Sequence, residues 1–389
     1  MDFLLLFNSF PQPLKISGVC FLNMKILVFT SRYTATRDII NEDFGRQVRL
    51  FERLRDLGHE IDFFCVDYKK MENKNLYLHK MRIFIRPFKH LKFFNLLSDL
   101  RKVIKNDNYD LLIATSDPLW GVIGYFMSKK YKIPFVYDIQ DNYLVYKSYK
   151  LPFFGLFERH VVKNSDLVMC AGNILTQNAM KIRKKKTITI PNGVDTKLFR
   201  PLDKISSRKK LKLPSDKKII SYIGSLQKIQ GVDILIKAYE DLRDEIKNLN
   251  LLLVGNIGTA SKESFDFDKK GLIYLGSLSQ KNVSFAINAS DLMVIPYPKN
   301  KFTEVMFSPY KIMEFMACDK PLVITDAGEM YRHIDDKKMI AKAGNIEDLK
   351  EKIRYALKLK KVNSRKTAMK FDWKNIASRL DKAIRELKQ

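Results

Sequence analysis

The sequence has few of the residues that build metal sites or disulfide frameworks. Its 389 residues include four cysteines and five histidines, with no C-x-x-C pair and no histidines at metal-ligand spacing. The cysteines lie far apart, at Cys20, Cys65, Cys170 and Cys318. This pattern argues against a zinc site and against a disulfide framework, and it favours a reducing, cytosolic setting.

No apolar run in the sequence is long enough to span a bilayer. A spanning helix needs about 18 to 20 consecutive apolar residues, and the best candidate, residues 111–127, contains Asp117 and Pro118. Any contact with a membrane is therefore expected to be peripheral.

Acidic residues are outnumbered by basic ones, 43 to 70, which gives a net charge of +27. A protein this basic is expected to have an anionic partner: a nucleic acid, an anionic membrane surface or a phosphorylated substrate. Charge alone keeps a nucleic-acid-binding protein open as an alternative. No recognition module for nucleic acid is visible, however, so we expect no nucleic-acid partner.

What is present is the composition of a globular protein with two domains. Hydrophobic residues make up 46% and charged residues 29%, which is typical of neither a disordered nor a membrane-spanning chain. The length suits two domains of about 150 to 200 residues each. Residues 1–23 have an apolar patch without a basic segment before it or a cleavage site after it. We expect them to be an extension ahead of the true start at Met24; a short N-terminal anchor is the alternative.

The patterns that follow Met24 predict βαβ units. Residues 25–30 form a continuous apolar run, typical of a strand buried on both faces of a parallel sheet. Phe44, Val48 and Phe51 follow at helical spacing, and residues 61–66 are predicted to be the next strand.

Polar residues mark the end of the predicted strand at 133–139. They are Asp138, Gln140 and Asp141. In open α/β sheets ligands bind outside the carboxyl ends of the strands, so these residues are the best candidates for a binding site in the first domain. The alternative is that Asp141 only caps a turn.

Residues 69–105 are basic and aromatic. Such a segment can lie on anionic lipid with its rings at the interface; the alternative is an ordinary strand and helix whose aromatic residues are core and whose lysines are solvated. Residues 145–163 are again basic and aromatic, and they could cover an apolar, lipid-linked acceptor.

A helix is predicted to start at Ser308, because serine is a good N-cap and Pro309 suits the first turn. The free N–H groups there, with Lys311 one turn in, would seat a phosphate. Glu314 could accept hydrogen bonds from sugar hydroxyls; alternatively, Lys311 and Glu314 form a surface i,i+3 pair. The turn 224–231, between a strand and a helix, is a second predicted phosphate seat.

Residues 308–321, S-P-Y-K-I-M-E-F-M-A-C-D-K-P, resemble the donor-sugar segment of family-four glycosyltransferases, in the subgroup that reads S-P-x-K-x-x-E. Residues 190–195, I-P-N-G-V-D, resemble the hinge signature of the same family. The resemblance implies an α/β protein of the GT-B fold, with two Rossmann-like domains facing each other across a cleft. It also implies retaining transfer of a hexose-type sugar from a nucleotide-sugar donor to a glycan or lipid-linked acceptor, without a metal or other cofactor.

The resemblance implies domain boundaries as well. The acceptor domain is expected over residues 24–196 and the linker over 197–217. The nucleotide-sugar domain is expected over 218–370, followed by a helix at 371–389 that packs back on the first domain.

The resemblance further implies roles for individual residues. Catalytic roles fall to Asp141, Lys228, Lys311 and Glu314. The residues expected to bind the donor are Gly224, Ser225, Lys228, Gln230, Gly231, Gly276, Leu278, Ser308, Pro309, Tyr310, Lys311 and Glu314. The acceptor side would comprise Gly45, Arg46, Asp138, Gln140 and Asp141, and the hinge Asn192 and Gly193. No metal site is expected, because the D-x-D match at residues 266–268 lies in a charged loop.

Three positions depart from the family pattern. Ser225 stands where most relatives have arginine, Gln230 where they have lysine, and Met306 where many have the first of two glutamates. Because the two missing cations would neutralise a leaving diphosphate, we expect altered donor chemistry. A catalytically inactive glycosyltransferase-like binding subunit is the alternative, and a nucleotide-sugar epimerase is a further one. The expected location is cytoplasmic, with peripheral contact to the inner face of the cell membrane left open.

Overall fold

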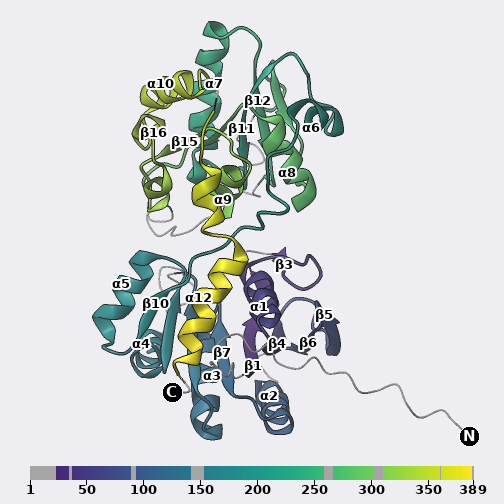
Figure 1. Cartoon of the computed structure of the whole chain (residues 1–389), viewed down its shortest axis with the longest axis vertical. Coiled ribbons are helices and arrows are strands. Elements are labelled where there is room, and N and C mark those ends of the chain that lie inside the picture. Colours follow the sequence, from purple (N-terminus) through teal and green to yellow (C-terminus); the bar gives the residue numbers. More distant parts are fainter. Residues whose placement is uncertain are drawn as a thin grey trace, which may run out of the picture.

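The computed structural model describes residues 23–34, 37–88, 93–141, 153–257, 266–300, 303, 310–359 and 361–387. Figure 1 shows two lobes, one above the other, each built on its own sheet. This arrangement confirms the predicted α/β fold with two Rossmann-like lobes. The predicted extension, residues 1–23, lies outside the described residues apart from Asn23.

The first lobe contains an eight-stranded sheet in the order β10-β9-β8-β7-β1-β4-β6-β5. All neighbours run parallel except β5 and β6. Its strands are β1 (Lys25–Ser31), β4 (Glu60–Asp67), β5 (Lys74–Leu78), β6 (Met81–Pro87), β7 (Leu111–Thr115), β8 (Phe135–Ile139), β9 (Leu167–Cys170) and β10 (Thr187–Thr189). A separate antiparallel pair consists of β2 (Tyr33–Thr34) and β3 (Arg37–Asp38).

Helices cover both faces of this sheet. The helices are α1 (Arg46–Asp56), α2 (Phe93–Asp107), α3 (Pro118–Tyr131), α4 (Phe154–Asn164) and α5 (Asn173–Ile182). Residues of α1 and of the last helix of the chain pack on one face, with Ile26 and Val28 of β1. Residues of α2 to α5 pack on the other, with Leu27 and Phe29. Successive β1 residues therefore enter opposite cores, which is why its sequence is apolar throughout.

The second lobe has a six-stranded sheet, all parallel, in the order β13-β12-β11-β14-β15-β16. Its strands are β11 (Lys218–Ile223), β12 (Leu249–Val254), β13 (Leu272–Tyr274), β14 (Leu292–Ile295), β15 (Leu322–Thr325) and β16 (Ile340–Ala341). Its helices are α6 (Lys204–Lys210), α7 (Val232–Glu245), α8 (Gln280–Ala289), α9 (Tyr310–Ala317), α10 (Ile346–Ala356) and α11 (Arg365–Met369), with 3-10 turns at Lys228–Gln230, Met330–His333 and Lys337–Met339. The expected linker, residues 197–217, thus contains α6, which packs on α8.

Two segments of chain cross between the lobes side by side. The Val194 N–H donates to the Phe371 carbonyl at 2.9 Å, and the Trp373 N–H donates to the Val194 carbonyl at 3.2 Å. A β-carbon on Gly193 would lie 2.6 Å from the Trp373 ring, so this crossing requires glycine. The second segment leads into α12 (Trp373–Arg385), whose apolar face, with Leu380, enters the core of the first lobe (Figure 1).

The described residues contain no helix that is both long enough and apolar enough to cross a membrane.

Candidate active site

Lys311 of α9 lies against the loop that follows β11. Its ammonium donates to the Tyr297 hydroxyl at 2.9 Å and to the Tyr222 hydroxyl at 3.4 Å. A β-carbon on Gly224 would lie 1.9 Å from Lys311 Nζ, so the amine occupies the space beside that glycine. The two segments predicted to seat phosphate, around residue 224 and around residue 311, are therefore neighbours in space.

Gly224, Gly255 and Gly276 lie side by side, each just after the end of one of the neighbouring strands β11, β12 and β13. The Gly255 N–H donates to the Gly276 carbonyl at 2.8 Å, and a β-carbon on Gly255 would lie 1.8 Å from the Gly224 carbonyl oxygen. The carboxyl edge of the sheet thus presents backbone beside Lys311. Leu278, also predicted to bind the donor, follows these glycines and is half-buried.

The rest of the 224–231 turn leads into α7. Gln230 is buried, and its side-chain oxygen accepts from the Tyr222 hydroxyl at 2.7 Å. The same hydroxyl donates to the Ser225 carbonyl at 3.1 Å. Lys228 is exposed on the 3-10 turn, and Gly231 is the N-cap of α7 with a φ of 74°. Tyr222 thus holds the turn closed, and burial beside Tyr297 raises the pKa of the Tyr222 hydroxyl well above its usual value.

Glu314 lies one turn further along α9 and faces the first lobe. Burial raises the pKa of its carboxyl to about 7, although the positive charges of Lys311 and Arg37 act to lower it. Arg37 belongs to β3 of the first lobe, so Glu314 lies between the lobes. It borders a cavity of about 20 Å³ whose lining also includes Phe44, Gly45, Arg49, Gly193, Val194, Asp195, Phe199, Gln280 and Trp373.

Arg46 and Asp138 form a buried ion pair in the first lobe. The Arg46 Nε and Nη2 donate to the two Asp138 carboxylate oxygens at 3.1 and 3.0 Å, and its Nη1 donates to the Pro191 carbonyl at 3.1 Å. The Thr115 hydroxyl also donates to Asp138, at 2.8 Å. Because Arg46 and Asp138 are 1% and 0% exposed, they brace the start of α1 against β8 and the hinge rather than opening to a ligand.

Of the other three acceptor-side candidates, Gly45 lines the small cavity beside Glu314, and the structure separates Gln140 from Asp141. Gln140 joins the ion pair, since its amide donates to Asp138 at 2.8 Å and its oxygen accepts from Gln47 at 3.0 Å. Asp141, one residue later, borders a cavity of about 290 Å³ beneath α4 and α5. Gln140 and Asp141 therefore belong to different surroundings.

Several predicted residues cannot be placed. Ser308, Pro309 and Met306 lie outside the described residues. Tyr310 is the first residue of α9.

Sequence reasoning missed Tyr222, Tyr297 and Arg37. Tyr297 comes two residues after the end of β14, at the carboxyl edge of the parallel sheet, where ligand sites are expected. Its position after a parallel strand could therefore have identified Tyr297 as a candidate site residue. Tyr222 lies inside β11 and Arg37 on a two-residue strand, so neither carries a comparable signal.

Two family models match the chain, one on each lobe. The model described as Glycosyltransferase Family 4 matches residues 47–198, and the model described as Glycosyl transferases group 1 matches residues 203–372. The chain belongs to the group 1 glycosyltransferases. The predicted family is thereby confirmed.

Curated glycosyltransferases are similar to parts of the chain. TuaC of Bacillus subtilis, named for teichuronic acid biosynthesis, is 28% identical over 59% of this chain and 56% of its own length. A D-inositol 3-phosphate glycosyltransferase of Corynebacterium jeikeium is 23% identical over 59% of each chain. The chain thus spans a little over half the length of these relatives.

Solved structures share the two-lobed fold. A glycosyltransferase from Rickettsia africae has a TM-score of 0.74 at 17% identity, covering 95% of this chain and all of that one. HepE of Anabaena, solved in complex with UDP, has a TM-score of 0.70 at 16% identity, covering 93% of this chain and all of that one. Identities this low support the GT-B fold and nothing finer.

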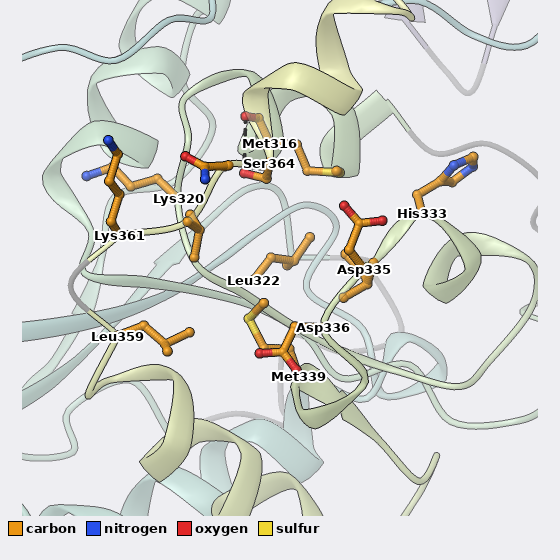
Figure 2. A pocket seen from close by; sticks show the side chains of 13 residues that line it. Met316, Lys320, Leu322, His333, Asp335, Asp336, Met339, Leu359, Lys361 and Ser364 are labelled. Atoms are coloured by element: carbon orange, nitrogen blue, oxygen red, sulfur yellow. Dashed lines mark hydrogen bonds between the residues drawn. The ribbon is translucent and has the colours of Figure 1, made fainter.

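A separate cavity of this group 1 glycosyltransferase, of about 270 Å³, lies in the second lobe (Figure 2). Figure 2 shows Lys320 and Lys361 on one side of it and Asp335 and Asp336 on the other. None of its lining residues is a predicted donor residue, although Met316 comes from α9. Among the described residues, no group of three or more His, Cys, Asp or Glu side chains is arranged to hold a metal ion.

Proposed function

We propose that the protein transfers a hexose-type sugar from a nucleotide-sugar donor to a glycan or lipid-linked acceptor, with retention of anomeric configuration. The observation that carries this proposal is the position of the Lys311 amine beside Gly224, at the carboxyl edge of the second sheet. A cation, exposed backbone and the nearby start of α7 together suit a diphosphate.

On the donor side, Lys311 and the start of α7 stabilise the charge that develops on the leaving diphosphate. Fixed donors of this kind are worth about 3–4 kcal/mol each to a transition state when water is excluded. Lys228, on the turn before α7, supplies a second cation. Because these groups carry the required positive charge, we propose a reaction that uses no bound metal or other cofactor. Glu314 accepts hydrogen bonds from the ribose hydroxyls.

On the acceptor side, Asp141, just after the end of β8, orients the acceptor hydroxyl, and Gln140 holds the end of β8 through its hydrogen bond to Asp138. The nucleoside diphosphate departs from the face that the acceptor attacks, and an oxygen of the leaving phosphate takes the acceptor proton. Closure of the lobes about the 192–196 and 371–373 crossings excludes water. We propose a cytoplasmic enzyme that contacts an anionic membrane peripherally.

The relatives support the substrate classes. HepE of Anabaena was solved with UDP, and TuaC is named for the synthesis of a glycan, teichuronic acid. A nucleoside diphosphate sugar and a glycan or lipid-linked acceptor are therefore the substrates to test first.

The proposal is tested by a thermal-shift screen of UDP-, GDP-, ADP- and dTDP-sugars, followed by product analysis of the anomeric configuration. We expect one nucleotide class to stabilise the wild type and to lose most of that effect in Lys311→Ala. Lys247→Ala, which removes an exposed lysine after α7, is the matched control. Equal stabilisation of both variants, or inversion in the product, contradicts the proposal.

One observation favours a second function, that of a catalytically inactive subunit that binds nucleotide sugar. Gln230, which stands where relatives have lysine, is buried and accepts from Tyr222 at 2.7 Å, so it offers no cation to a diphosphate. Donor binding by calorimetry without hydrolysis or transfer, across glycan and lipid-linked acceptors, is the result that selects this function.

A further inference from the structure

Helix α4 carries a row of large apolar side chains on its outer face. Leu156 and Phe157 of α4 are 64% and 51% exposed, and Phe153, the residue that caps the start of α4, is 70% exposed. Phe126 of α3, 51% exposed, continues the row, because its ring stacks on His160 of α4 at 6.4 Å. We call these four apolar residues the α4 face.

Helix α4 packs against the first lobe through the side opposite the α4 face. Val161 and Val162 are buried in the core of the first lobe, and Glu158 turns inward to accept from the Tyr137 hydroxyl at 3.2 Å. The helix therefore has an apolar inner side that is covered and an apolar outer side that is not. Grouped exposed side chains of this size usually mark an interaction surface.

Cations border the α4 face. Lys163 lies on α4, and Lys129 and Lys130 lie in the last turn of α3, three and four residues after Phe126. Arg159, also on α4, lines the cavity of about 290 Å³. The one acidic residue of α4 is the inward Glu158. A second copy of this chain would bring the same cations against these, which disfavours a dimer through this face.

We propose that the α4 face docks the protein on an anionic lipid bilayer. Phenylalanine and leucine side chains on one side of a helix enter the boundary between headgroups and acyl chains, and flanking lysine and arginine attract anionic headgroups. The net charge of +27 acts in the same direction over longer range. Because the other side of α4 is buried in the first lobe, this attachment is interfacial.

The position of α4 connects this surface to the acceptor side. The inner side of α4, including Gly155 and Glu158, lines the cavity of about 290 Å³ that Asp141 also borders. A bilayer on the outer side therefore lies about one helix diameter, roughly 10 Å, from that cavity. This inference rests on the proposed function, and it specifies the acceptor as one carried by a membrane lipid.

Vesicle co-sedimentation tests the docking surface. The full chain is mixed with vesicles of phosphatidylcholine alone or of phosphatidylcholine and phosphatidylglycerol in equal parts. We expect binding to the anionic vesicles that falls as salt rises, and a loss of roughly tenfold or more in Leu156→Ser/Phe157→Ser. Ile205→Ser, which removes an exposed apolar side chain of α6 in the second lobe, should bind as the wild type does.

The charge requirement is tested with Lys130→Glu/Lys163→Glu, which should weaken binding to anionic vesicles and reduce the preference for them. Equal binding to both vesicle types, or unchanged binding by the Leu156/Phe157 variant, overturns the proposal. The proposal is also overturned if sedimentation velocity shows a dimer of the wild type that Leu156→Ser/Phe157→Ser abolishes, because a second copy of the chain then covers the α4 face. The nucleotide-sugar thermal shift, read without lipid on the same variants, separates failure of docking from failure of the proposed function.

Discussion

The amine of Lys311 fills the space that a side chain at Gly224 would need, since a β-carbon there would lie 1.9 Å from Lys311 Nζ. Lys311 belongs to α9 and Gly224 to the loop after β11. The Lys311 ammonium also donates to the Tyr222 hydroxyl at 3.4 Å. Any side chain at residue 224 would therefore displace Lys311, which the proposed function assigns to the donor diphosphate.

Gly224→Ala should weaken donor binding more than it weakens the fold. The new methyl group displaces a flexible side-chain end, and the φ of 154° costs about 1–2 kcal/mol for alanine. Donor affinity should fall by about tenfold or more, because Lys311 is pushed off its position. Gly344→Ala, with a φ of 82° and no atom within 4 Å of the new carbon, should show comparable strain and unchanged affinity. Isothermal titration calorimetry with the donor found in the screen compares the donor affinity of the two variants.

Tyr297→Phe should loosen Lys311 without removing its charge. The Tyr297 hydroxyl is buried and accepts from the ammonium at 2.9 Å, and a hydrogen bond to a charged group is worth about 1.5–3 kcal/mol. We expect donor affinity to drop by about threefold to tenfold. Tyr239→Phe removes another buried hydroxyl, one that donates to the Lys270 carbonyl at 2.9 Å, and should lower stability while affinity is unchanged. Equal affinity losses in both variants would mean that the effect is general destabilisation.

Much of the fold could be predicted because burial on both faces leaves a direct mark on sequence. The β1 run was predicted from its continuous apolar residues, and its side chains do enter two cores. The linker was harder: α6 has Asp203 as N-cap, with its carboxylate accepting from the Ser206 N–H at 2.7 Å. Pro201, Pro214 and a charged composition hid that helix.

The site could be predicted only in part, because sequence does not reveal which polar groups pair with one another. Lys311 and Gly224 were each selected, but the tyrosines that join them were not. Arg46 and Asp138 look like ligand-binding groups at a helix start and a strand end, yet each satisfies the other. A buried charge needs such a partner, and a partner 92 residues away is not visible in local patterns.

Glu314 should make stability depend on pH. Its pKa is raised from 4.5 to about 7 by burial, so the unfolded chain releases this proton at lower pH than the folded protein does. The free energy of unfolding should therefore fall as pH rises through this window, by about 1–3 kcal/mol relative to Glu314→Gln, which has no proton to lose. Urea titrations of both proteins at several pH values measure the difference. A constant offset between the two curves contradicts the raised pKa.

The same residue should make donor binding depend on pH in the opposite direction. Sugar hydroxyls donate more strongly to a carboxylate than to a carboxylic acid, so donor affinity should increase from about pH 6 to about pH 8. Glu314→Gln should bind more weakly and with a flatter profile. If both proteins show the same slope, the titration of another group, such as the donor itself, is responsible.

Glu329 should hold the lobes together. This residue of the second lobe is 4% exposed, and its carboxylate accepts from the Ile174 N–H, in the first turn of α5 of the first lobe, at 3.3 Å. An anion at a helix start is stabilised by about 0.3–1 kcal/mol or more when partly buried, so Glu329→Ala should shift the protein several-fold toward an open form. Small-angle X-ray scattering should show a larger radius of gyration without donor. Glu351→Ala, which removes a 70% exposed carboxylate on α10, is the control, and an equal radius in all three proteins would show that this contact does not hold the lobes closed.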